Sequence, residues 1–150
     1  MGWQTESSAL AEILSIPGIQ PMPKLVKKPL LGTIACGEPI LAVENIEDYL
    51  LVPDNIHCDF LLQCKGDSMT GARILDGDIV GIRQQEDVEN GEIAAVLIGD
   101  EATLKRVYKR ANKLILQAEN PAYEPLVYVN GELDEVRIIG KAVYFISTIR

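Results

Sequence analysis

The stretch that decides the fold is an apolar run and its return, Ile93-Ala94-Ala95-Val96-Leu97-Ile98-Gly99-Asp100-Glu101-Ala102-Thr103-Leu104-Lys105. The run from 93 to 98 is apolar on both faces, which predicts a strand at the centre of a sheet. Gly99 and Asp100 have the composition of a two-residue turn, so the chain is expected to return as a paired strand. Counting outward from that turn pairs Ile98 with Glu101, Val96 with Thr103, and Ala94 with Lys105.

Lys105 is an unusual residue to find opposite an alanine on a buried strand. Loss of water around an ammonium disfavours its charge, so the pKa of a lysine in this place is expected to fall. A neutral lysine amine can act as general base for a serine hydroxyl. The alternative is that Lys105 extends to the sheet edge and keeps its charge in water, as part of a solvated ribbon. The residues alone leave both interpretations open.

The rest of the chain repeats the pattern of short apolar strands between turn residues. Further strands are expected at 60–64, 79–82, 102–108, 114–116, 127–129 and 136–146. Such spacing predicts an all-β, compact sandwich or barrel-like domain. Upstream, residues 1–16 read as a short helix at best, and the proline- and lysine-containing stretch 17–29 reads as a linker. The predicted domain therefore covers residues 30–150.

Composition excludes several classes of protein. The 150 residues carry a net charge of −8, so this chain is a poor candidate for a main nucleic-acid-binding surface. Its three cysteines are an odd number, which argues against a disulfide framework and favours a reducing, cytoplasmic setting. No apolar run is long enough to cross a bilayer, and the N-terminus has no secretory pattern. His57, the single histidine, has none of the usual metal spacings, so we expect no metal or cofactor.

Two short segments could carry chemistry. Gly66-Asp67-Ser68-Met69 places a hydroxyl on a tight turn, although Gly-Asp-Ser is also ordinary turn composition. Ala35-Cys36-Gly37 leaves the backbone bare, so another group could approach it closely, and it could equally be a strand end. Cys36 is a competing nucleophile, but no base lies near it in sequence.

These segments occur in an order that resembles a known family. The motifs are Ala35-Cys36-Gly37-Glu38-Pro39, Gly66-Asp67-Ser68-Met69, Asp76-Gly77-Asp78, Asn90-Gly91-Glu92, Glu101-Ala102-Thr103-Leu104-Lys105-Arg106 and Glu119-Asn120-Pro121. Together they resemble the C-terminal domain of the LexA and phage-repressor family, from about residue 30 to the end. That family also includes the accessory subunit of the mutagenic SOS polymerase.

The resemblance implies an all-β peptidase that cleaves its own chain. Ser68 would be the nucleophile and Lys105 the general base. Cys36 and Gly37 would flank the scissile bond, and the backbone amides of Asp67 and Ser68 would form the oxyanion hole. Ala35, Glu101 and Thr103 would help to hold the cleavage loop.

The resemblance also implies partners. Family members are homodimers that bind an operator through an N-terminal helix-turn-helix domain, and residues 1–16 could be the tail of such a domain. A RecA filament on single-stranded DNA promotes cleavage, which relieves repression in the SOS response to DNA damage. A phage antirepressor as the trigger, a non-cleaving dimerisation or sensor module, and a polymerase-accessory protein remain alternatives.

Overall fold

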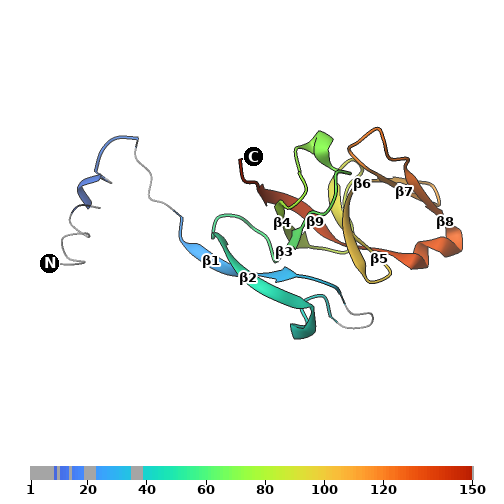
Figure 1. Cartoon of the computed structure of the whole chain (residues 1–150), viewed down its shortest axis with the longest axis horizontal. Helices are drawn as coiled ribbons and strands as arrows, with labels where there is room; N and C mark the ends of the chain where they lie inside the picture. Colours follow the sequence, from blue (N-terminus) through green and yellow to red (C-terminus); the bar gives the residue numbers. More distant parts are fainter. Residues whose placement is uncertain (1–8, 10, 14, 19–22, 35–38, 150) are drawn as a thin grey trace.

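The computed structural model describes residues 9, 11–13, 15–18, 23–34 and 39–149, and in these the chain forms one nine-stranded sheet (Figure 1). The strands are β1 (Leu25–Leu31), β2 (Ile46–Pro53), β3 (Phe60–Gln63), β4 (Ile79–Gln84), β5 (Ile93–Ile98), β6 (Glu101–Arg110), β7 (Lys113–Gln117), β8 (Leu126–Val129) and β9 (Val136–Ile146). Their order across the sheet is β2-β1-β3-β4-β9-β5-β6-β7-β8. Short 3₁₀ turns interrupt them, namely η1 (Val43–Asn45), η2 (Thr70–Ala72) and η3 (Asn130–Glu135). The all-β prediction is confirmed.

The β5–β6 hairpin has the register that its sequence predicts. Ile98 lies opposite Glu101, Val96 opposite Thr103, and Ala94 opposite Lys105. Gly99 in the turn has φ +64°, a conformation that glycine adopts without strain. On its other side β5 pairs with β9, so it is a central strand and its apolar faces are both covered.

Residues 25–29 differ from the expected linker, because β1 already begins at Leu25 and pairs with β2. Pro29 has no N–H to donate to a neighbouring strand. It is tolerated because β3 pairs with β1 only at Leu30, so β3 loses no hydrogen bond at Pro29. That single β1–β3 contact is parallel, whereas the other strand pairings within the described residues are antiparallel. Pairing with β2 therefore outweighs the proline and lysine content of this stretch. The division of the chain into 1–16, 17–29 and 30–150 otherwise stays a prediction.

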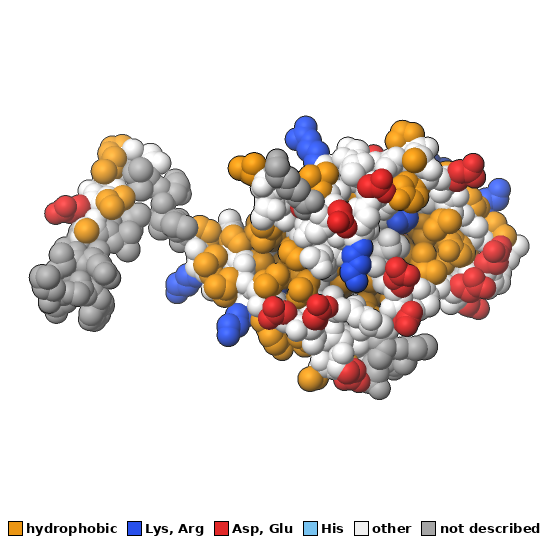
Figure 2. Space-filling view, viewed as in Figure 1, with side chains coloured by type: hydrophobic (Ala, Val, Ile, Leu, Met, Phe, Trp, Pro, Cys, Tyr) orange, Lys and Arg blue, Asp and Glu red, His pale blue; other side chains and the backbone are white. Residues whose placement is uncertain are grey.

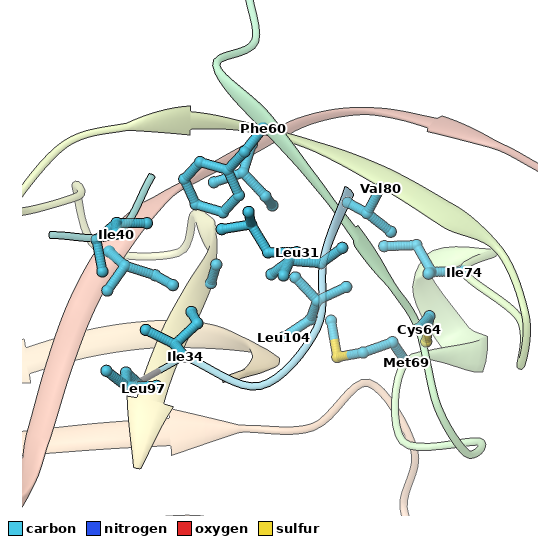
Figure 3. Packing of buried hydrophobic residues seen from close by; sticks show 14 residues of the cluster. Leu31, Ile34, Ile40, Phe60, Cys64, Met69, Ile74, Val80, Leu97 and Leu104 are labelled. Atoms are coloured by element: carbon cyan, nitrogen blue, oxygen red, sulfur yellow. The ribbon is translucent and has the colours of Figure 1, made fainter. Parts of the chain in front are cut away.

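The largest hydrophobic cluster joins elements that are distant in sequence. Figure 3 shows Leu31 at the end of β1, Phe60 on β3, and Leu104 on β6 packed together with Met69. Met69 is fully buried, with 0% of its surface exposed. The core thus ties the turn after β3 to strand β6.

Candidate active site

Ser68 lies on the loop between β3 and β4, and this loop is closed at its base. The Cys64 N–H donates to the Asp78 carbonyl at 2.8 Å, and the Gly77 N–H donates to the Cys64 carbonyl at 2.8 Å. These two backbone hydrogen bonds bring the two ends of the loop together next to the sheet. The Ser68 turn lies within the loop that they close.

Gly66 and Met69 set the shape of that tip. Gly66 has φ +86°, and its N–H donates to Asp76 Oδ1 at 2.7 Å. Met69 points inward, next to Leu104 and Cys64 (Figure 3). Ser68, between them, is half-buried. A glycine that permits the bend and a buried methionine that anchors it therefore place the hydroxyl at the edge of the core.

A second loop, residues 119–123, braces the Ser68 turn from outside. The Asn120 amide Nδ2 donates to the Asp67 carbonyl at 2.9 Å, and the Gly71 N–H donates to the Glu119 carbonyl at 2.7 Å. The Glu119 carboxylate in turn forms an ion pair with Arg106. Arg106 follows Lys105 on β6, so one chain of contacts connects the lysine strand with the serine turn.

Lys105 is half-buried, and its Nζ donates to Thr103 Oγ1 at 3.0 Å and to the Leu104 carbonyl at 3.1 Å. Burial lowers the pKa of the Lys105 side chain, and the negative charges that Cys64 and Glu101 can carry only partly offset this. Burial likewise raises the pKa of the Cys64 thiol. Of the two interpretations of Lys105, the structure favours the desolvated lysine. Within the described part of the chain, no hydrogen bond joins it to Ser68.

One cleft of about 370 Å³ is lined by Ser68 and by the residues of β6 that directly precede Lys105. Its lining comes from four segments: Leu30, Leu31, Gly32 and Thr33; Glu47; Leu62, Gln63, Cys64, Lys65, Ser68 and Met69; and Asp100, Glu101, Ala102, Thr103 and Leu104. Ser68, Glu101 and Thr103, all predicted site residues, are therefore neighbours on one cleft. Lys105 is not part of this lining, but its Nζ donates a hydrogen bond to Thr103, which is.

The described residues on either side of the segment that was predicted to be cleaved are held by the protein core. Ile34 is buried in the core, and its N–H donates to the Asp100 carbonyl at 3.4 Å. Downstream, the buried Asn45 side chain donates to the carbonyls of Pro39 and Ile40, at 3.1 and 3.0 Å. Residues 34 and 40 are thus both held by the core. The predicted Ala35, Cys36 and Gly37 lie outside the described residues.

The bracing residues are the part of the site that sequence reasoning missed. Glu119-Asn120-Pro121 stood out as a motif, but nothing in its composition points to Asp67, which is 53 positions away. Tyr123, whose hydroxyl donates to Asp67 Oδ1, carried no signal. The Arg106–Glu119 ion pair also carried no signal in the sequence, because it joins the middle of β6 to the loop that follows β7.

Of the other titratable groups, His57 lies away from this cleft, whereas Cys64 is part of its lining. His57 is exposed, and its carbonyl accepts a hydrogen bond from Arg83 Nε at 3.2 Å. Cys58 and Cys64 are free, buried thiols. Among the residues that the structure describes, no three His, Cys, Asp or Glu side chains gather as a metal site would require.

Comparison with known proteins defines the class. Residues 29–143 match the family described as Peptidase S24-like, which is more than half of the chain, so the chain belongs to that family. It is 44% identical over 122 residues to the LexA repressor of Caldicellulosiruptor saccharolyticus, covering 79% of this chain and 58% of the relative.

Two further relatives are similarly close. The LexA repressor of Listeria welshimeri is 42% identical over 144 residues, covering 93% of this chain and 68% of the relative. That of Desulforamulus reducens is 46% identical over 123 residues, covering 80% and 55%. The chain thus spans between 55% and 68% of the length of these three relatives. In the described part of the chain, no helix combines the length and apolar character that crossing a membrane requires.

Proposed function

We propose that this chain is the self-cleaving regulatory domain of a LexA-type repressor. Ser68 and Lys105 would cut its own bond between Cys36 and Gly37. The observation that carries the proposal is the shared cleft: Ser68, the Thr103 hydroxyl that holds Lys105, and the end of β1 all line it. The end of β1 and Thr33 precede the predicted scissile bond by a few positions, which supports the proposal that substrate and catalyst share this cleft.

The contacts of Lys105 suit a general base. A neutral amine has two hydrogens and one lone pair, whereas an ammonium has three hydrogens and no acceptor. Thr103 Oγ1 and the Leu104 carbonyl accept two hydrogens from Nζ. Because burial lowers the pKa of Lys105, its neutral form is easier to reach than that of a solvated lysine, and the lone pair of that form would be left for the Ser68 hydroxyl. Thr103 would hold the amine in addition to its predicted role beside the cleavage loop.

The proposed reaction balances within these groups. Ser68 Oγ attacks the Cys36 carbonyl carbon while its proton passes to Lys105 Nζ. The Cys36–Gly37 bond then breaks, the Gly37 nitrogen takes that proton, and an ester remains between Ser68 and Cys36. Water, deprotonated by the neutral lysine, hydrolyses the ester and restores Ser68. Because nucleophile and scissile bond share one chain, orientation can contribute about 7–11 kcal/mol to lowering the barrier.

The oxyanion that forms at Cys36 would be stabilised by the backbone amides of Asp67 and Ser68. Neither N–H donates a hydrogen bond to any described residue. Unoccupied backbone donors next to the proposed nucleophile are what such stabilisation needs, since fixed donors need no reorganisation when charge develops.

In the cell, we infer, cleavage relieves repression in the SOS response. The likeness to LexA repressors supports this, and with it a homodimer, RecA on single-stranded DNA as trigger, and an operator bound through a helix-turn-helix segment outside residues 1–150. The acidic side chains spread over the face in Figure 2, and the net charge of −8, do not suit DNA binding by this segment. Glu101 and Ala35 would support the cleavage loop.

The test is incubation of the purified chain from neutral to alkaline pH, followed by intact-mass measurement. Two fragments that divide at Cys36–Gly37 are expected, and they should form faster as pH rises because Lys105 loses its proton. Ser68→Ala should stop cleavage. If the wild-type chain stays whole at alkaline pH and with activated RecA, the chain is a non-cleaving module. If Ser68→Ala still cleaves, Ser68 is not the nucleophile.

A further inference from the structure

We propose that Asn120 is a positioning residue: by holding the Asp67 carbonyl, it fixes the peptide plane that carries the Ser68 N–H. This inference rests on the proposed function, in which that N–H stabilises the oxyanion. Asn120 touches neither Ser68 Oγ nor Lys105 in the described contacts, so it would act only through the backbone of the turn.

The Asp67 carbonyl is unusually well held for an exposed turn. It accepts from Asn120 Nδ2 at 2.9 Å, from Thr70 Oγ1 at 3.2 Å and from the Thr70 N–H at 3.4 Å. The Thr70 bonds are local, since they lie within the turn itself. Only the Asn120 bond reaches from another part of the fold, and it is the shortest of the three.

Because a peptide unit is planar, fixing the Asp67 carbonyl also fixes the direction of the Ser68 N–H. The Asp67 carbonyl and the Ser68 N–H belong to one peptide unit, which is rigid and trans. In a trans unit these two groups point in opposite directions. A carbonyl drawn toward the 119–123 loop therefore turns the Ser68 N–H away from that loop, where it has no described hydrogen-bond acceptor.

Asn120 is itself prevented from turning. Its Oδ1 accepts from the Ala122 N–H at 3.0 Å, which assigns the other end of the amide, Nδ2, to Asp67. The neighbouring Glu119 is fixed by Arg106 and by the Gly71 N–H. The donor thus sits on a loop that is anchored to β6, the strand that carries Lys105.

The discriminating variant is Asn120→Asp. The carboxylate is nearly isosteric, so it can still accept from Ala122, but it has no hydrogen to donate to Asp67. Deleting an oxyanion donor outright costs about 10²–10³ in rate, so loosening one should slow self-cleavage about 10- to 100-fold. The alkaline midpoint, the pH at which the cleavage rate is half of its maximum, should not change, because Lys105 keeps its contacts. Asn112→Asp, an exposed residue in the β6–β7 turn, makes the same charge change and should cleave at the wild-type rate.

A second variant separates an effect on the turn from an effect on folding. Thr70→Val removes a weaker donor to the same carbonyl without changing charge, and should slow cleavage less, about 2- to 5-fold by the same reasoning. Thermal unfolding of each variant reports folding separately. Wild-type cleavage rates in both Asn120→Asp and Thr70→Val would overturn the inference. So would a dependence of the rate on pH in which the alkaline midpoint shifts while the maximal rate stays that of the wild type.

Amide spectra separate this inference from the proposed function. In ¹⁵N-labelled Ser68→Ala protein, which stays whole, Asn120→Asp should shift the amide resonance of residue 68 and increase its motion, whereas Asn112→Asp should not. If the wild-type chain never cleaves, the proposed function fails, and these spectra still decide the positioning. An unmoved residue-68 amide overturns it.

Discussion

The loop that carries Ser68 and the strand that carries Lys105 open onto one cleft but are held by different kinds of contact. Lys105 is placed by strand register, eleven positions from its partner Ala94 across a two-residue turn. Ser68 is placed by a buried methionine behind it and by residues 119–123 in front of it. The base therefore depends on local pairing, and the nucleophile on contacts between distant parts of the chain. Disturbing the brace should change catalysis without unfolding the sheet, whereas disturbing the hairpin should change both.

Replacing Lys105 tests the proposed base, whose position depends on strand register. Lys105→Met removes the only proposed base, so self-cleavage should fall by at least about 10³-fold, as for removal of a catalytic dyad member. Lys113→Met, an exposed lysine on β7, is the matched control and should cleave normally. Intact mass at alkaline pH is the measurement. Substantial cleavage by Lys105→Met would assign the base elsewhere.

The same variant should reveal the stability cost of burying this lysine. Because burial lowers the folded-state pKa, the folded protein binds fewer protons than the unfolded chain between that lowered pKa and the unfolded value of about 10.4. The free energy of unfolding of the wild type, relative to Lys105→Met, should therefore rise with pH through this window. Urea unfolding at neutral pH and at pH above 10 measures it; a difference that is independent of pH would contradict it.

Met69→Ala tests the anchor behind the serine turn. Truncating a fully buried methionine should cost about 2–5 kcal/mol of unfolding free energy, since the core cannot fill the space. Met69→Leu keeps most of the volume and should cost less than about 1.5 kcal/mol. Urea unfolding compares the two. Equal losses in both variants would mean that the turn depends on the thioether itself and not on the filled volume.

Gly71→Ala tests the contact between the turn and the brace. An added Cβ would lie 2.6 Å from the Glu119 carbonyl oxygen, so either the loop moves or the hydrogen bond breaks. Such overpacking should cost about 1–3 kcal/mol and slow self-cleavage. Gly131→Ala, where a Cβ meets nothing within 4 Å, is the control. If the two alanines have the same effect, the brace is not tight against the turn.

Gly99→Ala tests the hairpin turn. Nothing lies near the added Cβ, so only the backbone conformation, φ +64°, is strained, at about 1–2 kcal/mol. Gly99→Asn should cost less because asparagine tolerates this conformation. Both are measured by thermal unfolding. A full loss with asparagine would show that the turn conformation is not what limits the register.

The smallest effect is expected at the exposed Asp87–Lys109 pair, remote from the cleft. Lys109→Met should change stability at neutral pH by less than about 0.5 kcal/mol, because solvent screens such pairs. The hydrogen bond from Lys109 lowers the pKa of Asp87, so the small contribution should be lost as pH falls through that lowered pKa. Cleavage should not change. A larger loss would mean that β6 is held by its surface ion pairs as well as by register.

Much of the fold and part of the site follow from local sequence. The β5–β6 register could be predicted because a two-residue turn leaves one way to pair its flanking residues, and Lys105 was desolvated as its neighbours implied. The start of β1 could not, because proline and lysine at 25–29 look like a linker until β2 is there to pair with them. The brace could not either, since an asparagine has no pattern that names a carbonyl 53 positions away.

By itself, then, the sequence determined the all-β class and the central hairpin, because each depends on residue types within a few positions of one another. Ser68 and Lys105 were predicted as candidates from the order of motifs along the whole chain. Only the tertiary structure decided that Ser68 and the Thr103 that holds Lys105 face one cleft, and that Arg106, Glu119 and Asn120 link the two. The reason is physical: strand pairing near a tight turn is enforced by chain connectivity, whereas contacts across the core depend on how the whole sheet curves and packs.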